Sequence, residues 1–165
     1  MSAGITMTST HADLHEQWRA MLELAASEVF EIMLNAQLNR CDDRSTPDVA
    51  EYTAMVGLAG AMCGVISLRC SAKTAGLIAS RMLGVPPEEA ENQTRDAIGE
   101  VCNMIGGNFK TKLAGSGSQC LLSVPTVITG ADYHLHSLAE GGMLEVAMVF
   151  ETSTIRITLE MTGAS

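Results

Sequence analysis

The chain of 165 residues has few basic residues, few aromatic residues and no long apolar run. Nineteen acidic residues stand against ten basic ones, and the resulting formal charge of −9 repels nucleic-acid phosphates and anionic lipid headgroups. No local cluster of lysine and arginine reverses this charge. We therefore expect neither a nucleic acid nor a membrane surface as a partner.

Cysteine pairs that would mark a disulfide framework or a zinc site are also missing. The number of cysteines is odd, and no two of them form a Cys-x-x-Cys motif. This usage favours a reducing compartment, and we expect the protein to lie in the cytoplasm. The five residues are Cys41, Cys63, Cys70, Cys102 and Cys120.

The uncharged and largely apolar stretch of residues 52–68 approaches the length of a membrane span. Its glycines and its alternating apolar side chains instead predict two strands that meet at a turn near Gly60. Residues 1–10 carry no positive start and no apolar run, so we interpret them as a flexible N-terminal tail. Residues 11–165 have the size of a single domain.

The spacing of apolar residues predicts an α+β domain. Helices are predicted at about residues 11–39, 72–83 and 88–113, and strands at about 49–58, 62–70, 120–129, 133–138, 143–150 and 154–161. Since a long helix followed by strands occurs twice, we expect a pseudo-symmetric fold. Its long helices would pack on one face of a mostly antiparallel β-sheet.

The third predicted helix carries a narrow polar stripe. If Asp96 is placed at zero on a helical projection, Glu100 falls at roughly +40° and Asn103 at roughly −20°. The apolar residues of this helix project to the opposite side, which we expect to face the core. The stripe is therefore predicted to point outward.

Three glycines border this stripe, although a glycine inside a helix costs about 1 kcal/mol relative to alanine. Gly99, Gly106 and Gly107 lie within roughly 80° of its centre. Their missing side chains would let another surface approach the helix closely. The alternative interpretation is that Asp96, Glu100 and Asn103 are ordinary exposed polar residues of a helix.

Other candidate sites carry weaker signals. His134 and His136 share a strand face, and His11 and His15 share a helical turn, but neither pair has an evident third ligand. The glycine-serine run 115–118 lacks the Gly-Lys-Ser/Thr of a phosphate-binding loop, and Cys102 projects toward the buried side of its helix. We therefore expect no metal and no cofactor in this chain.

Two motifs resemble the CheC/CheX/FliY chemotaxis phosphatases. The run Asp96-Ala-Ile-Gly-Glu100-Val-Cys-Asn103-Met-Ile-Gly-Gly107-Asn108 resembles the family signature, an Asp or Ser followed by Glu four residues later and Asn three residues after that. Residues 122–130 are similar to the Leu-Ser-hydrophobic-Pro-Thr strand that follows this helix in CheX-like proteins.

The resemblance implies hydrolysis of the aspartyl phosphate on a CheY-type response regulator. It implies that the Asn103 amide orients the attacking water and that Glu100 engages a lysine of the receiver. Asp96 would support the docking, and Gly99 and Gly107 would border the partner-binding surface. The Mg²⁺ of the reaction would belong to the receiver.

The resemblance also bears on the number of sites and on partners. In our alignment of the first helix, Ser27, Glu31 and Leu34 take the three signature positions, and leucine replaces the catalytic amide. This pattern implies one active site and a CheX-like homodimer, more than a complex with the deamidase CheD. The alternative function is a non-catalytic adaptor that binds a response regulator, CheD or the flagellar switch.

Overall fold

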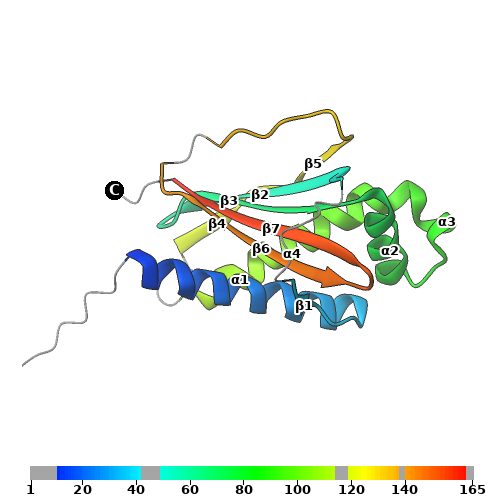
Figure 1. Ribbon diagram of the computed structural model, residues 1–165, viewed down its shortest axis with the longest axis horizontal. Helices are drawn as coiled ribbons and strands as arrows, with labels where there is room; N and C mark the ends of the chain where they lie inside the picture. The colour runs from blue at the N-terminus through cyan, green and yellow to red at the C-terminus, as the bar shows by residue number, and fades with distance from the viewer. Residues whose placement is uncertain (1–10, 42–48, 114–118, 138–139, 163–165) are drawn as a thin grey trace, which may run out of the picture.

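A computed structural model describes residues 11–41, 49–113, 119–137 and 140–162 (Figure 1). Its central feature is one antiparallel sheet in the order β1-β6-β7-β3-β2-β4, with β5 also paired to β2. The strands are β1 (Asn39–Arg40), β2 (Tyr52–Gly60), β3 (Gly64–Cys70), β4 (Cys120–Leu122), β5 (Thr126–Thr129), β6 (Met143–Phe150) and β7 (Ser153–Met161).

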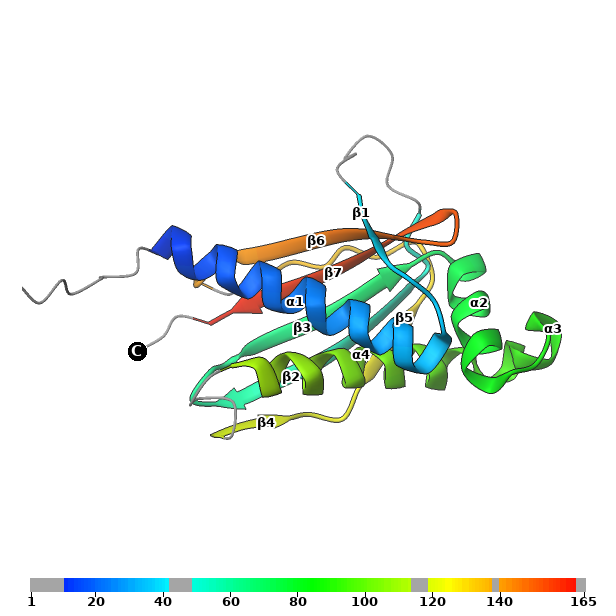
Figure 2. The ribbon, with the colours of Figure 1, turned by 90° about the horizontal axis from the view of Figure 1, so that it is seen from below.

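The long helices pack side by side on one face of this sheet. Figure 2 shows α1 (His11–Leu34) along β6 and β7, and α4 (Thr94–Lys112) along β2 and β3, with α2 (Ala72–Leu83) at one end. Alternate residues of the strands are buried beneath the helices, as the period of two requires. The predicted α+β class with long helices on a mostly antiparallel sheet is confirmed.

The two halves of the chain are arranged with pseudo-two-fold symmetry. The hairpins β2-β3 and β6-β7 meet in the middle of the sheet, where β3 pairs with β7. The short strand after each long helix then pairs with the hairpin of the other half, because β1 pairs with β6 and β4 pairs with β2. Each half of the chain therefore adds its short strand to the part of the sheet that the other half forms.

A continuous core joins these elements from Leu22 in α1 to Met161 in β7. Its largest fully buried side chains include Phe30, Phe109 and Phe150, and the rings of Phe30 and Phe150 meet edge to face at 5.3 Å. The predicted tail 1–10 lies outside the described residues.

The first helix is shorter than predicted. It ends at Leu34 because Asn35 takes a left-handed conformation with φ of 48°, and the Ala36 N–H donates to the Phe30 carbonyl at 3.2 Å. Asparagine tolerates this conformation, which closes a helix in the manner of a Schellman motif. The chain then extends into β1, a strand that the apolar spacing did not indicate.

The helical stretch predicted at 88–113 is divided. A short α3 (Pro87–Ala90) and a 3-10 turn, η1 (Glu91–Gln93), precede α4. Ala90 packs with Ala79 and Ala97 in a small cluster of its own, and this packing turns the chain between α2 and α4.

The strand predicted at 120–129 is also divided. β4 pairs with Leu58–Gly60 and β5 with Tyr52–Met55 of the same strand β2, and the intervening residues 123–125 include Pro125, which has no N–H to donate.

The strand predicted at 133–138 is wrong for its described residues, 133–137, which form no regular structure. The adjacent edge of β2 is already occupied by β4 and β5. Residues 133–137 instead cross the sheet face opposite the helices (Figure 1), where the hydroxyls of Tyr133 and Thr53 form a hydrogen bond.

None of the helices in the described ranges is both long enough and apolar enough to cross a membrane.

Candidate functional site

Helix α4 presents the predicted polar stripe on its outer face. Its opposite face is fixed by five side chains that are completely buried: Ile98, Val101, Cys102, Ile105 and Phe109. With this face in the core, Asp96 and Glu100 are exposed and Asn103 is half-buried. The structure thus brings the three polar residues to one surface, as the helical projection predicts.

The stripe residues make no polar side-chain contacts with the described part of the chain. Among the described residues, no hydrogen bond or ion pair holds the side chains of Asp96, Glu100 or Asn103. Two carboxylates and one amide are therefore available to a partner from outside. An amide can both donate and accept hydrogen bonds without adding charge, so Asn103 differs chemically from its two acidic neighbours.

The glycines beside the stripe have an internal explanation that the sequence did not reveal. A Cβ atom at Gly99 would lie 3.2 Å from Val127 Cγ2 and 3.5 Å from Pro125 Cβ. Gly99 is buried, so its missing side chain makes room for β5 of the same chain, whereas we expected it to border the partner-binding surface.

Gly106 and Gly107 lie against β4. A Cβ atom at Gly106 would lie 3.6 Å from Leu122 Cδ2, and one at Gly107 would lie 3.7 Å from Leu122 Cδ1. Gly106 is buried, but Gly107 is half-buried and stays at the edge of the outward surface. The three glycines thus let α4 approach the segment 122–127.

This segment is held in place by Ser123. The Ser123 N–H donates to the Gly57 carbonyl at 2.9 Å, and the Gly57 N–H donates to Ser123 Oγ at 2.8 Å. The two bonds attach the chain to β2 at the point where β4 ends and β5 has not begun. The Leu-Ser-hydrophobic-Pro-Thr motif is therefore held in a fixed position beside α4.

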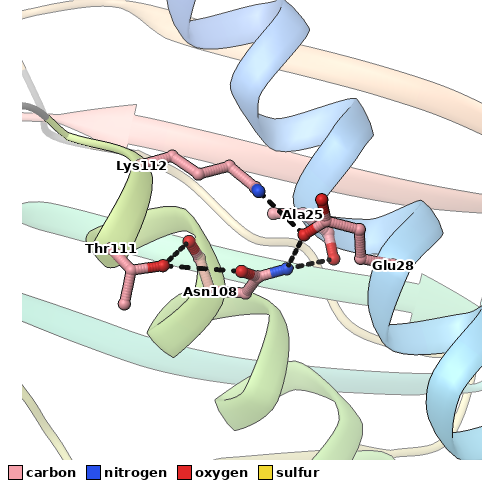
Figure 3. A network of polar contacts seen from close by, with 5 residues as sticks. All are labelled: Ala25, Glu28, Asn108, Thr111 and Lys112. Atoms are coloured by element: carbon pink, nitrogen blue, oxygen red, sulfur yellow. Dashed lines mark hydrogen bonds and ion pairs between the residues drawn. The ribbon is translucent and has the colours of Figure 1, made fainter.

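Asn108, the last residue of the quoted signature, has a structural role that we did not predict (Figure 3). Its Nδ2 donates to the Ala25 carbonyl at 3.2 Å and to Glu28 Oε2 at 2.7 Å, and Lys112 Nζ lies 2.7 Å from the same Glu28 oxygen. These contacts tie α4 to α1. Hydrogen bonds from Lys112 and Asn108 hold the pKa of Glu28 below its ordinary value.

The alignment proposed for the first helix is wrong. Leu34 is only 2 % exposed, so it faces the core and does not occupy an outward position comparable with that of Asn103. The expectation of a single site does not depend on this alignment, because α1 contains no asparagine at all.

The other candidates show no second site among the described residues. The ring centroids of His134 and His136 are 6.4 Å apart and those of His11 and His15 are 4.8 Å apart. In the described ranges, no three His, Cys, Asp or Glu side chains gather as metal ligands would. Burial raises the pKa of the Cys102 thiol to about 12, which makes it a poor nucleophile. The glycine-serine run 115–118 lies outside the described residues.

A cavity of about 770 Å³ lies between α1, β1 and the edge of β6. None of its lining residues belongs to α4, and its arginines are already paired with carboxylates. Arg40 lies 3.2 Å from Glu23 and Arg156 lies 2.7 Å from Glu145. Because the charged side chains of this cavity are already paired with one another, the stripe on α4 is the better candidate for a functional site.

Comparisons with known proteins identify a family and a fold. Residues 52–151 match the family model described as chemotaxis phosphatase CheX. The CheY-P phosphatase CheX of Thermotoga maritima is 30% identical over 84 residues, which cover 50% of this chain. The match spans only 54% of that relative.

Two solved structures share the fold. CheX from Vibrio vulnificus has a TM-score of 0.75 at 21% identity, covering 89% of this chain and 97% of that one. CheX in the CheX-CheY-BeF3-Mg complex from Borrelia burgdorferi has a TM-score of 0.71 at 23% identity, covering 88% of this chain and 98% of that one.

Proposed function

The chain belongs to the CheX family of chemotaxis phosphatases, and from this premise we propose that it hydrolyses the aspartyl phosphate of a CheY-type response regulator. The observation that carries the proposal is the outward stripe on α4. Its back is fixed by buried side chains, while its three polar groups have no partner among the described residues. The matched relative from Thermotoga maritima is itself named a CheY-P phosphatase.

In the proposed reaction, Asn103 enters the receiver and orients a water molecule in line with phosphorus. Phosphoryl transfer depends mainly on positioning and electrostatics, so a well-placed amide can act without covalent chemistry. A carboxylate in the same place would add negative charge beside the phosphoryl group. The buried face of α4 limits the freedom of its backbone, and this rigidity suits a positioning role.

Glu100 is proposed to pair with a lysine of the receiver and so to anchor the docking. It lies one helical turn before Asn103 and is exposed, so a long cationic side chain can reach it. Asp96 extends the acidic surface by another turn and would support the same contact. The Mg²⁺ of this reaction belongs to the receiver.

The test is the decay of a phosphorylated CheY-type receiver with trace amounts of this protein. Faster loss of phosphate at a molar ratio of about 1:100 supports a phosphatase, because each molecule must then act many times. Acceleration only at equal molar amounts would favour the adaptor, which binds a regulator without turning it over. Decay unchanged at every ratio, with every receiver from the same genome, would contradict the proposal.

The quaternary structure and the compartment are separate proposals. The family resemblance supports a homodimer and, less strongly, a complex with CheD. Sedimentation of the purified protein, alone and with CheD, tests both. The cysteine usage supports the cytoplasm, and fractionation of cells tests that location.

A further inference from the structure

The contacts of two glycines show which part of the sheet lies beside Asn103. The Cβ position of Gly99 faces Pro125 and Val127, and that of Gly106 faces Leu122. Helix α4 and the segment 122–127 therefore run in opposite directions. Asn103 lies between the two glycines in the helix. Along the axis of α4 it is therefore beside the residues between Leu122 and Pro125, which are Ser123 and Val124.

Val124 is unusual in this position, since 85% of its surface is exposed. A single exposed valine on a flexible loop needs no explanation. Here, however, the preceding residue is fixed to Gly57 by two hydrogen bonds, and the following residue is a proline packed beside Gly99. The fold holds an apolar side chain firmly in solvent at the level of the candidate catalytic amide.

We propose that Val124 is an apolar docking residue, which contacts the receiver beside its phosphorylated aspartate. This inference rests on the proposed function and adds a surface to it. Glu100 would supply a charged contact on one side of Asn103, and Val124 would supply a contact that excludes water on the other. The two contacts would flank the amide and hold the receiver against α4, without a part in the chemical step.

The two contacts differ in a measurable way. An ion pair at Glu100 weakens as salt rises, because mobile ions screen exposed charges. Burial of the Val124 methyl groups does not depend on screening. A variant of Val124 should therefore weaken docking at every salt concentration and leave the slope of affinity against salt unchanged.

The experiment compares Val124→Ala with Leu121→Ala in the full chain. Leu121 lies in β4, one residue before this segment, and is 72% exposed. Because its neighbour Leu122 faces α4, Leu121 points to the other face of the sheet. Binding is measured to a receiver carrying beryllium fluoride and Mg²⁺, a stable mimic of the phosphorylated state. Loss of two methyl groups from a buried contact predicts about a tenfold weaker Kd for Val124→Ala.

The expected result is weaker binding for Val124→Ala with unchanged Tm and unchanged kcat at saturating receiver, while Leu121→Ala binds like the wild type. Equal Kd values for all three proteins would overturn the inference, and so would equal weakening by both substitutions. If the wild type dephosphorylates the receiver normally while Val124→Ala changes nothing, only this inference fails. If the wild type neither binds nor dephosphorylates any receiver, the proposed function fails with it.

Discussion

Asn108 donates a 2.7 Å hydrogen bond to the Glu28 carboxylate, and this contact separates the roles of the two asparagines in α4. Asn108 lies against α1 and is used within the fold. Asn103, five residues earlier, projects to the outward surface, where no described residue engages its amide. The same residue type thus serves structure at one position and is available for chemistry at the other.

Asn108→Ala should reduce stability more than any substitution in the outward stripe. The change removes the bond to the Ala25 carbonyl, which by itself is expected to contribute about 1 kcal/mol, and it also removes a donor from Glu28. Each kcal/mol lowers Tm by roughly 2–4 °C in a protein of this size. Thermal unfolding checks this, with Asn103→Ala as the matched control that leaves Tm unchanged.

The contact between α1 and α4 should weaken in acid. Because the folded state lowers the pKa of Glu28, the carboxylate adds stability at every pH above its ordinary pKa. That contribution is lost as the pH falls from the ordinary pKa of the carboxyl through its lower, folded-state pKa. Denaturant unfolding of wild type and Glu28→Gln across this range measures it. A constant stability difference between the two proteins would contradict the assignment.

Glu100→Gln should weaken docking and reduce its dependence on salt. The substitution keeps the shape of the side chain and removes its charge, so a loss of about fivefold in affinity is expected from an exposed ion pair. The affinity for a receiver is measured at several salt concentrations. Glu16→Gln, on the first turns of α1, is the control that should bind like the wild type. An unchanged salt slope for Glu100→Gln would rule out the charged contact.

Gly107→Ala should separate stability from docking. Its new methyl group would meet Leu122 Cδ1 at 3.7 Å, an ordinary contact, and the helix should gain about 1 kcal/mol. If a receiver approaches α4 closely, the same methyl group should weaken docking. Gly76→Ala in α2, where nothing lies within 4 Å of the added atom, is the control that gains stability alone. Equal affinity for both variants would remove Gly107 from the partner-binding surface.

The sequence predicted the elements that have a strong period and an unambiguous core face. In α4, the buried positions from Ile98 to Phe109 and the outward stripe follow directly from the spacing. The end of α1 was not predicted, because it depends on the left-handed conformation of Asn35. The strand expected near Tyr133 failed for a different reason, since alternation cannot show that a neighbouring sheet edge is occupied.

The candidate site was predicted in part. The polar residues of the stripe could be placed because they depend only on helical geometry. The structural role of Gly99 could not be predicted, because it depends on close packing against Pro125 and Val127, which are distant in the sequence. The use of Asn108 was missed for the same reason, since its acceptors lie on α1.

The proposed role of the Asn103 amide is to position the attacking water. The most direct measurement is the rate of phosphate loss from a phosphorylated CheY-type receiver with catalytic amounts of wild type or Asn103→Ala, together with the affinity of each protein for that receiver. We expect the accelerated rate to fall at least about 100-fold in Asn103→Ala while affinity stays within about twofold. An Asn103→Ala variant that binds the receiver and dephosphorylates it at the wild-type rate would show that this amide does not position the water.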